Sequence, residues 1–185
     1  GVDYKFTDKI TGSYHFAQLD DVYNQHFLGL VASKPFGPGT FASDLRFAIS
    51  DDQGQARGGK IDNTSLNGLF SYALNGHKFS AGYQHMSGDS AFPYVDGSDP
   101  YLVNFVQIND FAGAEERSWQ ARYDFDFVTL GIPGLSFMSR YVSGDNIKLK
   151  NGDEGKEWER NSEIKYVVQS GALKDVAVRL RNATY

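Results

Sequence analysis

Apolar and polar residues alternate at every second position through much of this chain. The segment 41–50 reads FASDLRFAIS and the segment 118–127 reads SWQARYDFDF. Successive side chains of a β-strand point to opposite faces, so each of these strands would have one face rich in aromatic residues and one face carrying full charges. A water-soluble sandwich buries its apolar faces, but here such a face recurs in nearly every segment and no helical pattern could cover it. The alternation therefore indicates the wall of a β-barrel in a membrane.

Composition agrees with this interpretation and excludes several alternatives. The chain has 185 residues, 41% of them hydrophobic, with 14 Phe, 11 Tyr and 2 Trp. Its apolar runs fall far short of the roughly 18 residues that a membrane-spanning helix needs, whereas only every second residue of a barrel strand meets lipid. The absence of Cys excludes disulfides and thiolate metal sites, and a net charge of -5 gives no electrostatic footprint for nucleic acid. We expect no metal ion and no cofactor.

Turn signals divide the alternating segments into about ten predicted strands. The predicted strands cover residues 2–7, 10–19, 23–34, 40–51, 61–74, 77–88, 116–128, 135–145, 157–169 and 175–185. Tight turns rich in Gly, Pro and Asn are predicted at 7–9, 35–39, 75–76, 131–134 and 171–174, and longer polar connections at 52–60, 89–115 and 146–156. Short turns on one rim and long loops on the other are typical of outer-membrane barrels.

Ten strands pose a problem of closure. Barrels of about eight strands have interiors filled by side chains, whereas an aqueous channel needs about 16 to 18 strands. If this chain closed on itself, its many inward charges would be crowded into a narrow plug. We therefore expect residues 1–185 to form a single segment of a larger antiparallel transmembrane barrel.

Several separate stretches along the whole chain carry a recognisable pattern: 1–7 (GVDYKFT), 14–29 (YHFAQLDDVYNQHFLG), 44–47 (DLRF), 82–84 (GYQ), 86–89 (MSGD), 118–124 (SWQARYD), 131–135 (GIPGL), 157–161 (EWERN) and 178–183 (VRLRNA). In this order they resemble the C-terminal half of the OprD family of substrate-selective outer-membrane porins. The resemblance implies an all-β fold of roughly 18 strands, of which about ten are present here, with a narrow central constriction. It also implies a place in the bacterial outer membrane, among lipid and lipopolysaccharide, and selective passive uptake of small carboxylate-containing solutes such as organic acids or amino acids.

If the aromatic faces point to lipid, the alternation places the charged residues in the lumen. A single β-bulge would invert this assignment downstream of it within a strand. The predicted lumen residues are Asp44, Arg46, Lys78, Arg122, Asp124, Asp126, Arg140, Glu157, Glu159, Glu163, Lys165, Arg179 and Arg181.

Arg179 and Arg181 are the most distinctive of these residues. They are two positions apart on one predicted strand, so they lie on the same face about 7 Å apart, and water or a carboxylate must offset their repulsion. They could be ordinary lumen charges paired with a wall acid such as Glu163, or they could bind a ligand. Porins of the OprD family line one wall with Arg and Lys residues that lead carboxylates through the pore, and this resemblance favours the second role. The remaining candidates for such a ladder are Arg46, Arg122, Arg140 and Lys165.

The segment 91–112 is the second candidate for function. At about 22 residues it is longer and more aromatic than a solvated loop needs to be, although it could also be a surface loop packed on its own aromatic residues. The resemblance implies that such a loop folds inward and narrows the pore, with Tyr94 and Asp110 opposite the basic wall. A polarised constriction of this kind selects a solute by charge placement and width. The candidate constriction residues are Tyr94, Asp96, Asp99, Tyr101 and Asp110.

Two other classes of barrel remain open as alternatives. Some outer-membrane barrels are hydrolases, and His85 lies two residues from Ser87, but the four His residues are scattered and the nucleophile and nucleotide-binding motifs are missing. We therefore do not expect an enzyme. A structural or adhesive barrel with a plugged lumen is the other alternative. The lipid-facing residues do not distinguish a monomer from a homo-oligomer such as a trimer.

Overall fold

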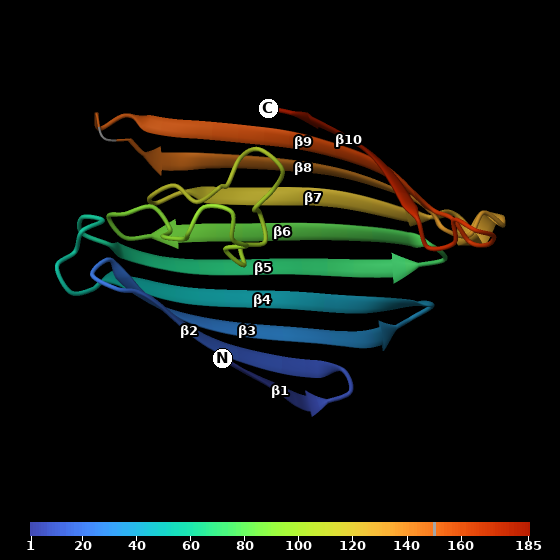
Figure 1. Cartoon of the computed structure of the whole chain (residues 1–185), viewed down its shortest axis with the longest axis horizontal. Helices are drawn as coiled ribbons and strands as arrows, with labels where there is room; N and C mark the ends of the chain where they lie inside the picture. The colour runs from blue at the N-terminus through green and yellow to red at the C-terminus, as the bar shows by residue number, and fades with distance from the viewer. Residues whose placement is uncertain (150) are drawn as a thin grey trace.

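The protein is described here by a computed structural model that covers residues 1–149 and 151–185. Ten strands form one antiparallel sheet in which each strand pairs with its neighbours in the chain, from β1 to β10 (Figure 1). The strands are β1 (Val2–Thr7), β2 (Ile10–Leu19), β3 (Tyr23–Phe36), β4 (Gly39–Asp52), β5 (Asp62–Leu74), β6 (His77–Ser87), β7 (Arg117–Asp126), β8 (Leu135–Lys148), β9 (Glu154–Val167) and β10 (Ala177–Thr184). The prediction of ten antiparallel strands is confirmed.

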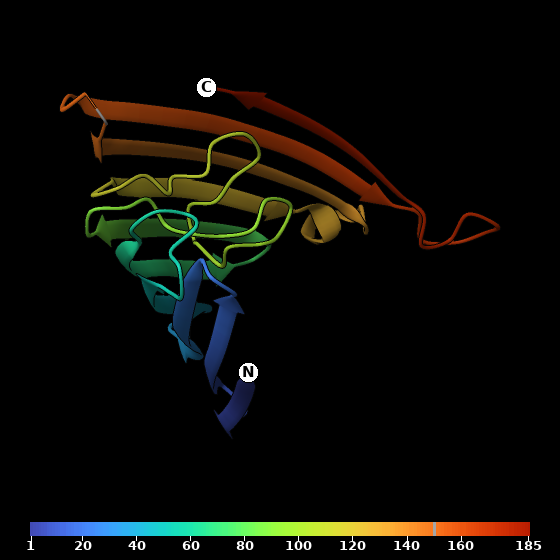
Figure 2. The ribbon, with the colours of Figure 1, turned by 60° about the vertical axis from the view of Figure 1, so that its left-hand side comes forward.

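The sheet is open and curved, with β1 and β10 at its two edges (Figure 2). The long connection between β6 and β7, residues 88–116, lies over its concave side, as the two ribbon views agree. We call this segment the inner loop. Within the described residues, no helix is long and apolar enough to cross a membrane.

The pairing register separates an apolar face from a polar face. Between β4 and β5, Phe47 lies opposite Leu66 on one face, and Arg46 lies opposite Asn67 on the other. The face that carries Asn67 is the concave one, because Asn67 contacts the inner loop. Buried polar residues of this face include Ser50, Asn63, Ser65, Gln84, Ser118, Gln120, Glu159 and Asn161. Exposed apolar residues of the convex face include Leu45, Leu66, Phe70, Phe79, Tyr83, Trp119, Tyr141, Trp158 and Ile164.

The hydrophobic core lies between the inner loop and the sheet. Phe92 and Leu102 of the loop pack with Ala48 and Met86 of the wall. A second cluster joins Val106 and Phe111 of the loop to Val142 of β8. The loop is therefore packed firmly against the sheet and occupies its concave side.

The short turns lie on one rim, as predicted, but two of these connections are longer than expected. At Asn75 and Gly76 both φ angles are positive, 48° and 81°, which is the geometry of a two-residue hairpin turn. The strand predicted to reach residue 128 ends at Asp126 instead, because the Asp126 carboxylate accepts a hydrogen bond from the Val128 N–H and starts a 3₁₀ turn, η1 (Phe127–Leu130). The turn predicted at 171–174 is part of a longer connection, residues 168–176.

The opposite rim carries the connections 20–22, 53–61 and 88–116, and the connection between β8 and β9, in which residue 150 lies outside the described residues. The long connection predicted at 146–156 is therefore shorter than expected. The register of β8 against β9 shifts between Gly144 and Ile147, and this irregularity lets β8 continue to Lys148. The polar residues of this stretch interrupt the alternation, so the sequence pattern predicts a loop there.

Candidate functional site

Side chains of the wall hold the inner loop by its backbone. Gln84 of β6 accepts a hydrogen bond from the Asn104 N–H at 3.1 Å and donates one to the Phe111 carbonyl. Gln120 of β7 donates to the Val103 carbonyl at 2.6 Å. Asn67 of β5 accepts from the Val103 N–H at 3.2 Å. These wall residues are buried, so their polar atoms need hydrogen-bond partners, and the backbone of the loop provides them. The positions of the wall residues therefore determine the path of the loop.

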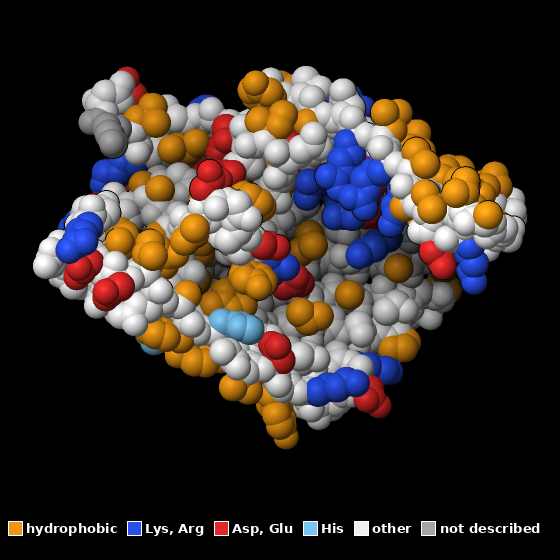
Figure 3. Space-filling model, in the orientation of Figure 1, with side chains coloured by type: hydrophobic (Ala, Val, Ile, Leu, Met, Phe, Trp, Pro, Cys, Tyr) orange, Lys and Arg blue, Asp and Glu red, His pale blue; other side chains and the backbone are white. Residues whose placement is uncertain are grey.

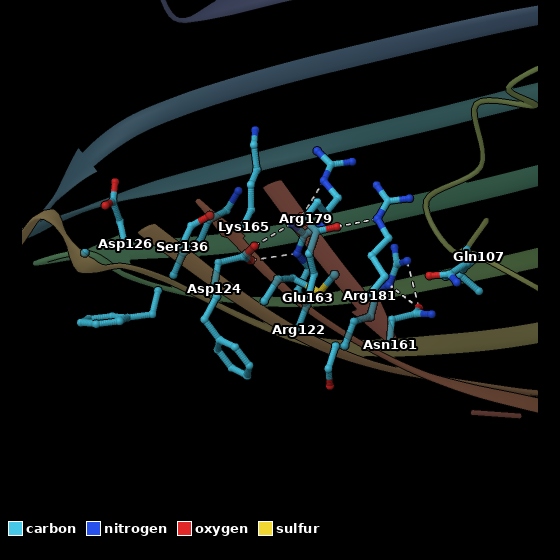
Figure 4. A pocket seen from close by; sticks show the side chains of 18 of the residues that line it. Gln107, Arg122, Asp124, Asp126, Ser136, Asn161, Glu163, Lys165, Arg179 and Arg181 are labelled. Atoms are coloured by element: carbon cyan, nitrogen blue, oxygen red, sulfur yellow. Dashed lines mark hydrogen bonds and ion pairs between the residues drawn. The ribbon is translucent and has the colours of Figure 1, made fainter. Parts of the chain in front are cut away.

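A basic pocket of about 750 Å³ opens on the concave face where the loop cover ends (Figure 4). In the space-filling view, Lys and Arg side chains gather in one group beside the loop (Figure 3). Six basic residues and three acidic residues line the pocket, so it is cationic in a chain whose net charge is -5. The basic residues are Lys78, Arg122, Arg140, Lys165, Arg179 and Arg181, and the acidic ones are Asp124, Asp126 and Glu163.

The register explains why these charges gather. Arg179 of β10 lies directly opposite Lys165 of β9, and Arg181 lies opposite Glu163. Like charges in directly opposed positions of an antiparallel pair are destabilising. The sheet therefore holds an arrangement of cations that its own stability does not favour, which is a common property of functional sites.

The acids of the pocket neutralise only part of this charge. Glu163 contacts both arginines of β10, with its oxygens 3.4 Å from Arg179 Nε and 2.7 Å from Arg181 Nε. Arg122 donates to both carboxylate oxygens of Asp124, at 2.8 and 2.6 Å. Figure 4 shows the terminal nitrogens of Arg179 and Arg181 directed away from Glu163. The pairing with Glu163 considered from the sequence is thus present, but one carboxylate serves two guanidinium groups.

Arg46 does not belong to this group. It lies on β4 and donates to both oxygens of Asp44, at 3.0 and 2.7 Å. The other five residues proposed from the sequence for the basic wall, Arg122, Arg140, Lys165, Arg179 and Arg181, line one pocket. Sequence reasoning gave no role to Asn161, which accepts two hydrogen bonds from Arg140 at 3.1 and 3.0 Å, although its place beside Glu159 on an alternating strand could have indicated it.

The inner loop meets the basic pocket through Phe105, Val106 and Gln107. Tyr94 and Asp110 lie instead at a second hollow of about 410 Å³, which Glu157 of β9 also lines. The Tyr94 hydroxyl donates a hydrogen bond to Asp110, and this bond, with burial and the nearby negative charges, raises the pKa of Tyr94 to about 12. The two residues therefore form a fixed pair at some distance along the loop from the cations.

The remaining loop candidates lie on the far side of the loop. Asp96 and Asp99 are exposed, and Asp99 accepts a hydrogen bond from the Tyr101 N–H at 2.8 Å. The Tyr101 ring packs against His15 and Phe27, with ring centroids 6.3 and 5.5 Å away. Neither these three candidates nor the Tyr94–Asp110 pair lines the basic pocket of the described chain, so their role in a constriction stays a prediction.

Glu116 is an acid of the site that sequence reasoning missed. It is the last residue of the inner loop, is 1% exposed, and accepts a hydrogen bond from the Gly113 N–H at 2.8 Å. Burial, followed by the negative charge of Glu157, raises the pKa of Glu116 to about 8. The raised pKa favours the protonated form of the Glu116 carboxyl group, and this lets Glu116 and Glu157 lie together under the loop.

The described residues contain no group of three His, Asp or Glu side chains arranged to hold a metal ion. His85 lies on the same face as Tyr83, the convex face, away from the basic pocket.

Comparison with known proteins agrees with this geometry. Residues 1–185 match the family described as outer membrane porin, OprD family. The chain is 37% identical to Porin D of Pseudomonas aeruginosa over 206 residues, covering 99% of this chain and 46% of that protein. It is also 37% identical to the porin-like protein GalP of Pseudomonas putida, covering 100% of this chain and 44% of that protein. The chain therefore spans a little under half the length of these curated relatives.

Solved structures give the same result. OccK5 (OpdH) of Pseudomonas aeruginosa superposes with a TM-score of 0.95 and 64% identity, over 98% of this chain and 50% of that one. OccK8 (OprE) of the same organism superposes with a TM-score of 0.93 and 40% identity, over 98% of this chain and 51% of that one. A family match along the whole chain, together with an open sheet that superposes on about half of each of these channels, shows that this chain belongs to the OprD family of bacterial outer membrane porins.

Proposed function

We propose that the complete protein is a channel for selective, passive uptake of small carboxylate-containing solutes, organic acids or amino acids, across the outer membrane. The observation that carries this proposal is the excess of cations in the basic pocket, which is lined by six basic residues and three acidic residues. A pocket with this charge attracts anions and repels cations, and its walls shield the field from bulk water.

Guanidinium groups suit this task. Their planar fork binds a carboxylate through two parallel hydrogen bonds, and they remain charged at all physiological pH values. In Arg179 and Arg181 the ion pair with Glu163 involves Nε, which leaves terminal nitrogens available to a solute. Glu163 competes for the same arginines, and this competition keeps binding weak. A transport pathway needs weak sites because the solute must leave as readily as it enters.

The inner loop would supply the narrow part of the pathway. It occupies the concave side of the sheet and borders the basic pocket through Phe105, Val106 and Gln107. A carboxylate passing between these residues and the cations would have its charged end on the wall and its apolar part on the loop. The proposal therefore includes selection by the shape of the apolar part as well as by charge.

The test is single-channel recording of the complete protein in a planar lipid bilayer. We expect small, anion-preferring channels whose current is blocked briefly by added carboxylates such as benzoate, glutamate or citrate. Amines of similar size should give much weaker block. A protein that inserts but does not conduct would favour a plugged structural barrel, and cation-preferring channels indifferent to carboxylates would overturn the proposed substrate class. Esterase or protease activity that is lost when His85 is replaced would favour the hydrolase alternative.

A further inference from the structure

Glu159 of β9 is a fully buried carboxylate that accepts its hydrogen bonds from uncharged groups. It is 0% exposed and accepts hydrogen bonds from three consecutive N–H groups of the inner loop. The donors are Gln107 at 3.2 Å, Ile108 at 3.2 and 3.1 Å, and Asn109 at 2.6 Å. Successive N–H groups that converge in this way form an anion-binding concavity, and here the anion is a side chain of the wall.

Asn161 connects this carboxylate to the basic pocket. Its Nδ2 donates to Glu159 Oε1 at 2.6 Å, and its Oδ1 accepts from Arg140 Nε and Nη2 at 3.1 and 3.0 Å. Only one orientation of the amide satisfies both neighbours, because a guanidinium can only donate and a carboxylate can only accept. Asn161 therefore stands between Glu159 and Arg140 and takes the place of a direct ion pair.

The contact with Glu159 falls at a particular point of the loop. Gln107 borders the basic pocket, whereas Ile108 and Asn109 border the second hollow. The carboxylate thus holds the loop at the boundary between the two spaces. Moving the loop away from the wall there would leave a buried charge without its hydrogen bonds, which is strongly unfavourable.

We propose that Glu159 is the positioning residue that sets the gap between the inner loop and the basic wall, and that Asn161 keeps Arg140 available to solutes by separating it from Glu159. This inference rests on the proposed channel function. Glu159 does not contact the solute. It fixes the backbone at Gln107, and Asn161 provides the Arg140 guanidinium with a neutral acceptor in place of a neutralising carboxylate.

The first test is Glu159→Gln in the complete protein, studied by single-channel recording. The amide removes the charge and presents an NH₂ group to N–H donors, so the loop should loosen. We expect a higher mean conductance, brief current fluctuations in the open state, and loss of the exclusion of a bulky carboxylate. The preference for anions over cations should persist, because the cations of the pocket are retained.

The matched control is Glu163→Gln. It changes an acid four residues further along the same face of β9, and this acid contacts Arg179 and Arg181 instead of the loop. It should lengthen the block by carboxylates without altering conductance fluctuations. The second variant, Asn161→Asp, places a carboxylate beside Glu159 and gives Arg140 an ionic partner. It should both loosen the loop and weaken carboxylate block, and it tests the inference if Glu159→Gln does not assemble.

The outcomes separate this inference from the function on which it rests. If the unchanged protein does not conduct or does not prefer anions, the proposed function fails. If it does, but Glu159→Gln shows the same conductance, noise and size exclusion, Glu159 does not position the loop. If Asn161→Asp leaves carboxylate block unchanged, Asn161 does not control the availability of Arg140.

Discussion

Arg122 and Arg140 occupy directly opposed positions on β7 and β8, with both side chains on the concave face. Each has a partner of a different kind. Arg122 is paired with the carboxylate of Asp124, whereas Arg140 has the neutral amide of Asn161. The opposed pair therefore keeps an excess positive charge, and Arg140 is the less neutralised of the two.

Replacing Arg140 by Gln should reduce anion preference without lowering stability. The change removes the repulsion between directly opposed like charges on β7 and β8, which is destabilising, and an amide can still donate to Asn161. Reversal potentials in a salt gradient and thermal unfolding in detergent would measure the two effects. The control is the double variant Asp44→Asn/Arg46→Gln, which removes an ion pair outside the pocket and keeps the net charge. A lower melting temperature with unchanged selectivity for Arg140→Gln would contradict the prediction.

Reversing the charge of both Arg179 and Arg181 to Glu should abolish carboxylate uptake. Two new carboxylates would stand beside Glu163, so the end of the pocket at β10 would change from cationic to anionic. We expect the affinity for a blocking carboxylate to fall by at least about tenfold, equivalent to about 1.4 kcal/mol. The variant Arg179→Lys/Arg181→Lys keeps the charge but loses the bidentate fork, so its block should be intermediate. Unchanged transport by the Glu variant would remove these residues from the pathway.

The attachment of the inner loop should weaken as pH rises. In the folded protein the pKa of Glu116 is raised from 4.5 to about 8 by burial and by the charge of Glu157. Between these two values the folded state holds a proton that the released segment would lose, so the stabilising contribution decreases as pH increases. Between about pH 5 and pH 8, open-channel noise should therefore increase, and the protection of the loop amides, corrected for the intrinsic pH dependence of hydrogen exchange, should fall. Glu116→Gln, which stays neutral, should show the low-pH behaviour throughout, and an identical pH profile in both proteins would refute the assignment.

Gly144 should not tolerate a larger residue. A Cβ at this position of β8 would overlap a side-chain oxygen of Glu116 and would lie 3.0 Å from the Phe111 ring. Gly144→Ala is therefore expected to destabilise the packing of the loop by about 1–3 kcal/mol, as in other overpacked sites. Limited proteolysis within residues 88–116 would report this effect. Ser143→Ala, one residue earlier and on the opposite face, is the matched control and should behave like the unchanged protein.

The alternation of side chains was sufficient to predict the strands and their faces. Segments such as 118–126 repeat it without interruption, and a one-residue error would have placed Arg122 among lipid-facing aromatic residues. The errors fall where local chemistry breaks the period. The Asp126 carboxylate starts a 3₁₀ turn inside the predicted strand. After Gly144 the register shifts, so the last residues of β8 are polar and do not follow the alternation.

The path of the inner loop could not be predicted in the same way. The chemistry of its own residues points to Tyr94 and Asp110, whereas Phe105 and Gln107 border the cations. The loop follows distant wall residues such as Gln84 and Glu159, which bind its backbone. No pattern within residues 91–112 records those partners, because a backbone N–H is present in almost every residue.

That mode of attachment also affects how new specificities could arise in a channel of this kind. Gln84, Gln120 and Glu159 form hydrogen bonds with backbone N–H and C=O groups of the loop. Every substitution of a loop residue except one to proline preserves these backbone groups. Loop side chains can therefore be substituted without removing the hydrogen bonds that hold the loop to the wall. A library randomised at Phe105 and Gln107 should be rich in folded channels with altered solute preference.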